Sequence, residues 1–216
     1  MAVVQNPITG RTRKSFSTAT FTKIFNQNVM RSKPTQVSNP KTLGQTSQRA
    51  AFKQCLQFTK EVLAAVKLGF QYFGSDMSPY SYSLKENQSN AVSGLPGSRI
   101  FDKTKFVASK GSLEGLINLF GTVDVHTGEV SLAWDAQSNG PNSDQGDKVQ
   151  LIIYHEDSGY VAFYKNIALR QDEHIPLISV PKDVDVAKYH AIVFLTPSSA
   201  IAKKRTSDSQ NILLEV

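Results

Sequence analysis

The chain has 216 residues and a formal net charge of +6, with 40% hydrophobic and 9% aromatic residues. This composition can supply a packed core, so it excludes a largely disordered protein. A single cysteine, Cys55, excludes an internal disulfide framework, and no His/Cys cluster has the spacing of a zinc site. Neither a long apolar run nor the apolar segment of a secretory signal occurs. We therefore expect a protein without a membrane span that is cytoplasmic when synthesised.

Charge is distributed unevenly along the chain. Residues 1–60 contain ten Lys or Arg and no Asp or Glu. Residues 1–110 hold 16 basic and 4 acidic residues and are net +12, whereas residues 111–216 hold 8 basic and 14 acidic residues and are net −6. This split predicts an anionic partner for the first half, or contact between the basic and acidic halves of neighbouring copies.

The first forty residues contain two β-prone runs, FSTATFTKIF and NQNVMRS, which predict short strands or an extended arm. Pro34 and Pro40 then exclude a continuous helix or central strand, because proline lacks an N–H and favours extended backbone in the residue before it. We interpret the polar segment around these prolines as a strap that presents Arg31 and Lys33 outward.

A helix of about seven turns is predicted between Lys41 and Tyr72, where no proline occurs. Apolar residues recur there at steps of three and four, which predicts one buried stripe. Basic residues border the stripe. We favour the interpretation that they form a solvated face, and the alternative is that they form a nucleic-acid surface. Cys55 lies within the stripe and is interpreted as a small buried hydrophobe rather than a nucleophile. The stripe comprises Phe52, Cys55, Leu56, Thr59, Val62, Leu63, Val66, Phe70 and Phe73, and the basic row Arg49, Lys53, Lys60 and Lys67.

The sequence after Phe73 is rich in Ser, Asn, Gly and Pro, which predicts a loop that contains a short helix through SYSLKENQSNAV. From Ile100 onward, short apolar runs are separated by turn signals such as HTGE, SNGP and EDSG. About six to eight strands at this spacing predict an antiparallel sandwich. We therefore expect an α+β fold in two parts. Residues 1–110 form a basic arm with short strands and one long helix, and residues 111–216 form the sandwich.

No nucleotide-binding, hydrolase or metalloprotease motif occurs in the sequence. His155, Glu156 and Asp157 are interpreted as exposed turn residues rather than a cation site, because carboxylates beside a Gly turn are typical of a hairpin. The loop at residues 138–147, SNGPNSDQGD, lacks the ligand spacing of an EF-hand and is interpreted as a solvent-exposed loop. We therefore predict no enzyme activity, no catalytic residue, no metal site and no cofactor. The other histidines are His126, His174 and His190.

The run GEVSLAWDA, with Trp134 near its end, resembles the second strand of a fibronectin type III or related immunoglobulin-like domain. The run DKVQLIIYHEDSGY resembles the strand that follows, and the runs YHAIVFLTP and NILLEV resemble the last hairpin. The resemblance implies that the sandwich is immunoglobulin-like. Five side chains are then expected to share one interior: Trp134, Ile152, Tyr154, Val193 and Leu195.

The whole chain also resembles an uncharacterised family of Bacteroidota proteins, a domain of unknown function. The runs that carry this resemblance are RSKP, SNPKT, the Gln/Arg-rich helix start at residues 45–52, KLGFQYF, DKVQLIIY and IALR. The chain departs from the family pattern at its start, where RTRKSFSTA stands in place of a Gly-rich run. The resemblance implies a shared fold and proximity to phage-derived genes, and it supplies no catalytic residue.

We expect a non-enzymatic structural or assembly protein, in the setting of a phage-like virion, that acts through contacts with other subunits of a homo- or hetero-oligomer. One alternative is a nucleic-acid-binding protein, because Phe16, Phe21 and Phe25 lie among basic residues. Another is a surface adhesion or carbohydrate-binding module with Trp134 and Tyr160 as platforms. The residues expected to contact a partner or nucleic acid are Arg11, Arg13, Lys14, Lys23, Arg31, Lys33, Arg49 and Lys53.

Overall fold

The computed structural model of the protein describes residues 2–3, 14–16, 18–24, 27–34, 36, 38–71, 77–198 and 206–216. The chain divides into two compact units, Met1–Thr42 and Leu43–Val216. None of the helices in the described ranges is long and apolar enough to cross a membrane. The division falls after Thr42 and not near Lys110, because the helices that follow Leu43 pack on the sandwich and share a core with it.

The N-terminal unit is an antiparallel sheet with the strand order β1–β4–β3–β2. The two runs expected to form strands supply β3 and β4, which pair from Ala19 opposite Ser32 to Ile24 opposite Gln27. Val29 is the one buried side chain among those described in this unit. The strands are β1 (Ala2–Val3), β2 (Lys14–Phe16), β3 (Ala19–Ile24) and β4 (Gln27–Ser32).

The segment between Lys33 and Thr42 contains Pro34 and Pro40 and has no helix or strand at its described residues. All of these described residues are exposed to solvent. The predicted interruption of regular structure by the two prolines is therefore present.

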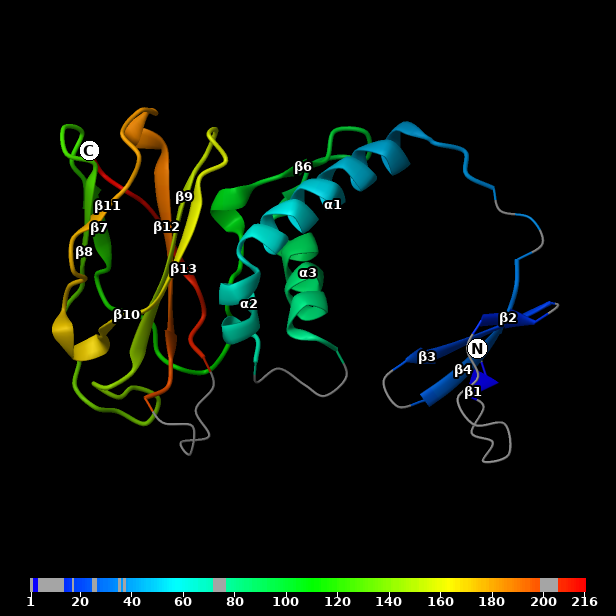
Figure 1. The fold of residues 1–216 in the computed structure, drawn as a ribbon, viewed down its shortest axis with the longest axis horizontal. Coiled ribbons are helices and arrows are strands. Elements are labelled where there is room, and N and C mark those ends of the chain that lie inside the picture. The colour runs from blue at the N-terminus through cyan, green and yellow to red at the C-terminus, as the bar shows by residue number, and fades with distance from the viewer. Residues whose placement is uncertain are drawn as a thin grey trace. The chain divides into compact units, whose positions relative to one another are not determined.

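Three helices follow: α1 (Leu43–Glu61), α2 (Leu63–Gly69) and α3 (Pro79–Asn90). The predicted long helix is divided at Val62, whose backbone has φ −95° and ψ 19°. Hydrogen bonds nevertheless cross this point, from Val62 N–H to Phe58 O and from Val66 N–H to Val62 O. The chain therefore bends at Val62, and Figure 1 shows α1 and α2 running in different directions. The bend brings α2 against β10 (Val161–Leu169) and β12 (Tyr189–Thr196) of the sandwich.

The sandwich consists of a three-stranded sheet, β11–β8–β7, and a four-stranded sheet, β10–β9–β12–β13. Counted along the sandwich, the first, second and fifth strands (β7, β8 and β11) form one sheet, and the other four form the second sheet. Immunoglobulin-like sandwiches whose fourth strand, here β10, joins the second sheet have this arrangement. A hairpin of β5 (Val92–Ser93) and β6 (Ile100–Phe101) precedes it. The sandwich strands are β7 (Phe120–Val123), β8 (Glu129–Ala133), β9 (Lys148–His155), β10 (Val161–Leu169), β11 (Ile178–Ser179), β12 (Tyr189–Thr196) and β13 (Gln210–Leu213).

Tyr189 opens β12 and donates a hydrogen bond from its hydroxyl to the carbonyl oxygen of Pro181, over 2.6 Å. Immunoglobulin-like domains use such a tyrosine corner to fix the start of the sixth strand to the connection before it. The expected fold class is confirmed: the chain is α+β, with short N-terminal strands, a helical region and an antiparallel immunoglobulin-like sandwich.

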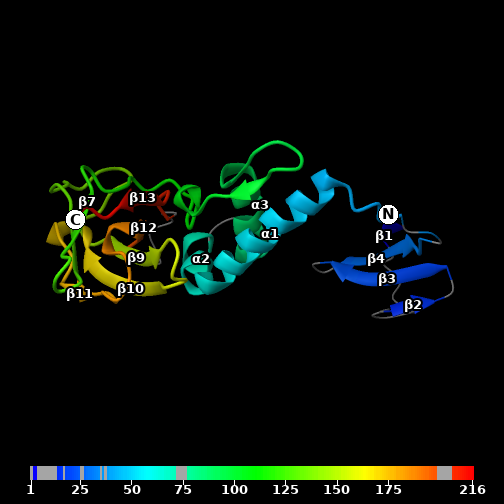
Figure 2. The same ribbon diagram turned by 90° about the horizontal axis from the view of Figure 1, so that it is seen from above.

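The four-stranded sheet is buried on both faces. Leu151 and Ile153 of β9 point into the sandwich, whereas Ile152 and Tyr154 point toward the helices and pack with Phe58. The expectation that Trp134, Ile152 and Tyr154 share one interior is therefore wrong, because successive residues of a strand face opposite sides. Figures 1 and 2 show the resulting three layers of this unit: helices, the four-stranded sheet and the three-stranded sheet.

Candidate partner-binding surfaces

The predicted contact residues of the N-terminal unit occupy different parts of its sheet. Arg11 and Arg13 lie outside the described residues. In the backbone register Lys14 pairs with Phe21, whereas Arg31 pairs with Thr20, the next residue of β3. Strand alternation therefore places the position of Arg31 on the other face from positions 14 and 23. Lys33 follows β4 and, like Arg31, is exposed.

Arg49 and Lys53 lie one turn apart on α1, and both are exposed. The buried face of α1 differs from the predicted stripe. Phe58, which the prediction omitted, is 3% exposed, whereas Phe52 is 38% exposed and Leu56 is half-buried. Phe58 is selected because the four-stranded sheet presents Tyr154 to it, with ring centroids 5.3 Å apart. Phe73 lies outside the described residues.

Cys55 is fully buried on the same face of α1. Burial raises the pKa of its thiol above the ordinary value, and a hydrogen bond with Thr59 only partly opposes this shift. A reactive cysteine needs the opposite shift and access to solvent. The side chain is accordingly a packing residue.

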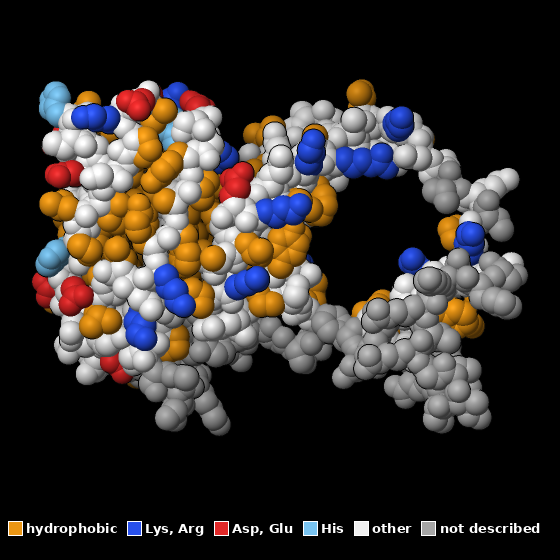
Figure 3. Space-filling view, in the orientation of Figure 1, with side chains coloured by type: hydrophobic (Ala, Val, Ile, Leu, Met, Phe, Trp, Pro, Cys, Tyr) orange, Lys and Arg blue, Asp and Glu red, His pale blue; other side chains and the backbone are white. Residues whose placement is uncertain are grey.

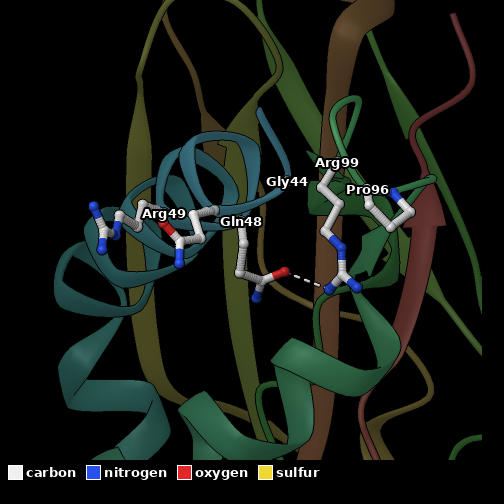
Figure 4. Close-up of a pocket in the computed structure, with 6 residues that line it drawn as sticks. Gly44, Gln48, Arg49, Pro96 and Arg99 are labelled. Atoms are coloured by element: carbon white, nitrogen blue, oxygen red, sulfur yellow. Dashed lines mark hydrogen bonds between the residues drawn. The ribbon is translucent and has the colours of Figure 1, made fainter. Parts of the chain in front are cut away.

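Arg49 also lines a shallow depression of about 400 Å³, together with Gly44, Gln45, Gln48, Pro96 and Arg99. Figure 4 shows Arg99 reaching from the β5–β6 connection to Gln48, whose side-chain oxygen accepts a hydrogen bond from the guanidinium. The hydroxyl of Ser47 accepts a second bond, from Gly97 N–H, over 3.0 Å. The first turns of α1 and this connection therefore form one continuous surface, and Arg99 is a basic residue of it that the sequence analysis missed.

Three residues that adjoin the lining residues in the chain carry apolar side chains that are open to solvent. Leu95 is 76% exposed, and Leu43 and Ile100 are also exposed. No Asp or Glu occurs in residues 43–60 or 87–101, from which the surface is built. We name it the basic helix surface; it comprises Leu43, Arg49, Phe52, Lys53, Leu95, Arg99 and Ile100.

His155 is buried, and its expected exposure is wrong. Its Nδ1 accepts hydrogen bonds from the backbone N–H groups of Asp157 (3.1 Å) and Ser158 (2.9 Å). Because Nδ1 is an acceptor, Nε2 carries the proton and donates to the carbonyl oxygen of Asp185, 2.9 Å away. The two ring nitrogens of His155 therefore join the β9–β10 turn to the backbone at Asp185. Glu156 is exposed, as expected of a turn residue.

Asp157 is exposed as well and forms an ion pair with Lys188 at 2.7 Å. A hydrogen bond from Lys188 is the main cause that lowers the pKa of the Asp157 carboxyl. The described residues contain no group of three or more His, Cys, Asp or Glu that could hold a metal ion.

The loop at residues 138–147 is largely exposed, as expected, but it ends at a buried ion pair. Asp147 and Arg170 are both fully buried, with 3.4 Å between carboxylate and guanidinium. Arg170 also donates to Gln137 Oε1 (2.7 Å) and to the carbonyl oxygen of Glu114 (2.6 Å). Burial lowers the pKa of Arg170, and the charge of Asp147 opposes this shift. The pair joins three connections of the sandwich and has no opening to a ligand.

Trp134 is also part of this structural network. Its indole N–H donates to the carbonyl oxygen of Arg170 over 2.8 Å, and the side chain is buried in the sandwich core. Tyr160 is half-buried and packs edge-on against Tyr189. A buried indole cannot stack on a sugar, so Trp134 is not a carbohydrate platform.

Tyr154 and His190 form a stacked pair, with ring centroids 5.1 Å apart. The Tyr154 hydroxyl is buried and has no hydrogen-bond partner among the described residues. Burial raises the pKa of Tyr154, so the phenol stays protonated at neutral pH and cannot act as a base there. Burial lowers the pKa of His190, which favours a neutral imidazole.

No curated protein matches the sequence. Among solved structures, the FN1–FN3 domains of chicken CNTN1 are similar to part of the chain, with 12% sequence identity and a TM-score of 0.29. This likeness covers 55% of the present chain and 36% of that chain. The model of a family of unknown function, DUF6266, matches residues 13–204. The match includes most of the N-terminal sheet, the helices and most of the sandwich. The chain therefore belongs to the DUF6266 family, a family of unknown function.

Proposed function

We propose that this protein is a non-enzymatic structural protein that assembles through subunit contacts, and that its N-terminal unit docks on a neighbouring copy. One observation carries the proposal. Residues 1–42 contain seven basic and no acidic residues, and their sheet has a single buried side chain, Val29, among the described residues.

The N-terminal sheet has little apolar burial of its own. Full burial of one valine contributes about 1.5–3 kcal/mol, whereas fixing the backbone of each residue costs about 1–2 kcal/mol. Ile24 and Met30 remain exposed, and the register places them on opposite faces of the sheet. Units of about 40 residues usually need oligomerisation or another staple. A partner that covers these side chains supplies the missing burial.

Charge favours another copy of the chain as that partner. The N-terminal unit has no internal countercharge, whereas residues 111–216 are net −6. Complementary charge raises the rate of association and selects its orientation. The connection through Pro34 and Pro40 is exposed and has no helix or strand at its described residues.

The proposed setting is a phage-like particle assembled in the cytoplasm of a bacterium of the Bacteroidota. The RSKP and SNPKT runs and their likeness to proteins encoded near phage-derived genes support this setting. Both runs lie at the end of β4 and in the exposed connection, where they are open to a neighbouring subunit.

Nucleic-acid binding is a second candidate, favoured by the exposed Arg49, Lys53 and Lys60 on α1. Ionic strength separates it from protein assembly. Contact with six to ten phosphates weakens about 10³-fold or more between 50 and 200 mM salt.

The test compares the full chain with a variant that lacks residues 1–42, by size-exclusion chromatography with light scattering at several concentrations. We expect the full chain to exceed the mass of a single 23.8 kDa chain, and the deletion to weaken association at least about tenfold, or about 1.4 kcal/mol. Circular dichroism should show that the sandwich still folds. A full chain that is monomeric throughout, or a deletion that associates normally, would contradict the proposal.

A further inference from the structure

The outer face of the three-stranded sheet carries a surface opposite in charge to the basic helix surface. Val130 and Leu132 of β8 point into the core, so Glu129 and Ser131 point outward. Phe120, opposite Ala133 in the register, is 60% exposed, and Leu177 before β11 is 69% exposed. Residues 111–147 contain six acidic residues and no Lys or Arg.

The last residues of the chain extend this face. Thr122 of β7 forms a parallel bridge with Glu215, whose neighbour Leu214 points into the core. Glu215 is exposed, and residues 206–216 contain no Lys or Arg. We name the face the acidic sheet surface; it comprises Ile117, Phe120, Glu129, Asp135, Leu177 and Glu215.

Exposed apolar side chains gather at these two surfaces. Ten large hydrophobic side chains are exposed among the described residues of the unit 43–216, and seven of them belong to one surface or the other. Clusters of exposed apolar side chains rimmed by charge are typical of protein interfaces. Figure 3 shows Lys and Arg side chains along the helical elements of this unit. Each surface therefore combines exposed apolar side chains with charged ones, basic on the helix surface and acidic on the sheet surface. Lys182, which reaches the β7–β8 turn beside Glu129, is a basic residue near the acidic sheet surface.

The two surfaces lie in the two outer layers of the unit 43–216. Figure 1 shows the four-stranded sheet between the three-stranded sheet and the helices. A single unit cannot bring its own outer layers together, so contact between the two surfaces needs two copies. Such a contact is head-to-tail, and its repetition closes into a ring or continues as a filament.

We propose that the basic helix surface of one copy docks on the acidic sheet surface of a second copy. The inference rests on the proposed assembly function and adds an interface that is separate from the N-terminal unit. Charge complementarity selects the partner: Arg49 and Arg99 meet Glu129 and Glu215 while the exposed apolar side chains of both surfaces are covered.

The test uses two charge-reversed variants of the full chain. The variant Arg49→Glu/Arg99→Glu has acidic groups on both surfaces, and the variant Glu129→Lys/Glu215→Lys has basic groups on both. We expect each variant alone to associate at least about tenfold more weakly than the unchanged chain, in sedimentation velocity at 100 mM salt. An equimolar mixture should recover association, because each variant then meets a surface of opposite charge.

A matched control makes the same change in net charge as Arg49→Glu/Arg99→Glu, at positions outside both surfaces. Lys148→Glu/Lys165→Glu removes two exposed or half-exposed lysines outside both surfaces and should associate like the unchanged chain. Two variants that associate normally, or a mixture that stays dissociated, would overturn the inference. If the deletion of residues 1–42 weakens association but the reversals do not, the inference alone fails. If the reversals act as expected but the deletion has no effect, the docking role of the N-terminal unit fails and this interface stands.

Discussion

The molecule contains two four-stranded antiparallel sheets that differ in how they are covered. The sheet β10–β9–β12–β13 is packed on one face by the three-stranded sheet and on the other by helices, and its two central strands are almost wholly buried. In the N-terminal sheet β1–β4–β3–β2, Val29 is the one buried side chain that the structure describes. Similar strand pairing therefore occurs with very different apolar burial.

This difference shows where each unit obtains its stability. Backbone pairing alone stabilises a sheet only modestly, because hydrogen bonds to water are exchanged for hydrogen bonds within the chain. The unit 43–216 adds two apolar cores to that pairing. The N-terminal unit adds a basic, acid-free surface, and its stability is expected to depend on what covers it. Substitutions that separate internal packing from outward contact therefore test the comparison.

The largest loss is expected from Phe58→Ala, at about 3–5 kcal/mol of the free energy of unfolding. Phe58 packs between helix and sheet, with ring centroids 4.8 Å from Phe106 and 5.3 Å from Tyr154. Urea unfolding followed by circular dichroism measures the loss. Phe52→Ala on the exposed side of α1 is the matched control and should cost far less. Equal losses for the two variants would show that the helices do not share a core with the sheet.

A comparable loss, also about 3–5 kcal/mol, is expected from Asp147→Ala, because the substitution leaves the Arg170 guanidinium buried without its carboxylate. The double variant Asp147→Ala/Arg170→Met removes both charges and should recover part of the stability. Thermal unfolding of the two variants and of the exposed control Asp183→Ala decides the point. If the single variant melted like the control, the pair would have no role in holding the loop.

His155→Ala should cost about 1–3 kcal/mol, because the backbone N–H groups of Asp157 and Ser158 lose their acceptor at a buried site. Glu156→Ala, at the next position, changes an exposed side chain and should leave the melting temperature unchanged. Thermal melts of the two variants test whether the buried His155 side chain stabilises the turn. An unchanged melting temperature for His155→Ala would return this residue to the solvated turn that the sequence suggested.

The strands, their order along the chain and the sandwich class could be predicted from the sequence, because alternation and turn signals are local. The sequence could not show that both faces of β9 are buried. VQLIIYH is apolar at nearly every position, so periodicity does not show which residues face the helices. The same limit explains why Phe58 was missed and Phe52 was chosen: both fit a helical stripe, and the position of the sheet selects between them.

The candidate surfaces could be predicted only in part. The acid-free composition of residues 1–60 pointed to Arg49 and Lys53, which the structure places on the exposed side of α1. Arg99 lies about fifty residues further along the chain and joins them through tertiary contact with Gln48. His155 was assigned to solvent because Glu156 and Asp157 follow it, and nothing local shows that Asp185 closes over its ring.

A smaller, pH-dependent effect is expected at His190. Burial lowers the pKa of its imidazole below the ordinary value of 6.5; Glu156 and Asp102 oppose the shift, and His155 and Lys103 add to it. The unfolded chain therefore takes up a proton near pH 6.5 that the folded chain does not, so stability falls as the pH decreases through this value. Well above pH 6.5 His190 is neutral in both the folded and the unfolded chain, so this loss of stability is absent.

The variant His190→Gln should remove this part of the pH dependence. Urea unfolding between pH 7.5 and 5 measures it. Carboxyls with lowered pKa values, such as Asp102 and Asp157, lose their contribution only as the pH falls through and below their ordinary value of 3.8, outside this range. An unchanged slope in the variant would assign the dependence to another group.

The smallest effect on stability, and the sharpest division between the two units, is expected from Arg31→Glu/Lys33→Glu. Both side chains are exposed, so the free energy of unfolding should change by no more than about 0.5 kcal/mol. Association should nevertheless weaken, because the reversal places carboxylates where the N-terminal unit is expected to meet an acidic neighbour. Lys148→Glu/Lys165→Glu makes the same change in net charge on the sandwich and should associate normally. Light scattering and thermal melts on the same samples separate the two quantities. If Arg31→Glu/Lys33→Glu lowered the melting temperature without weakening association, the charge of the N-terminal unit would serve its own folding and the contrast between the two sheets would fail.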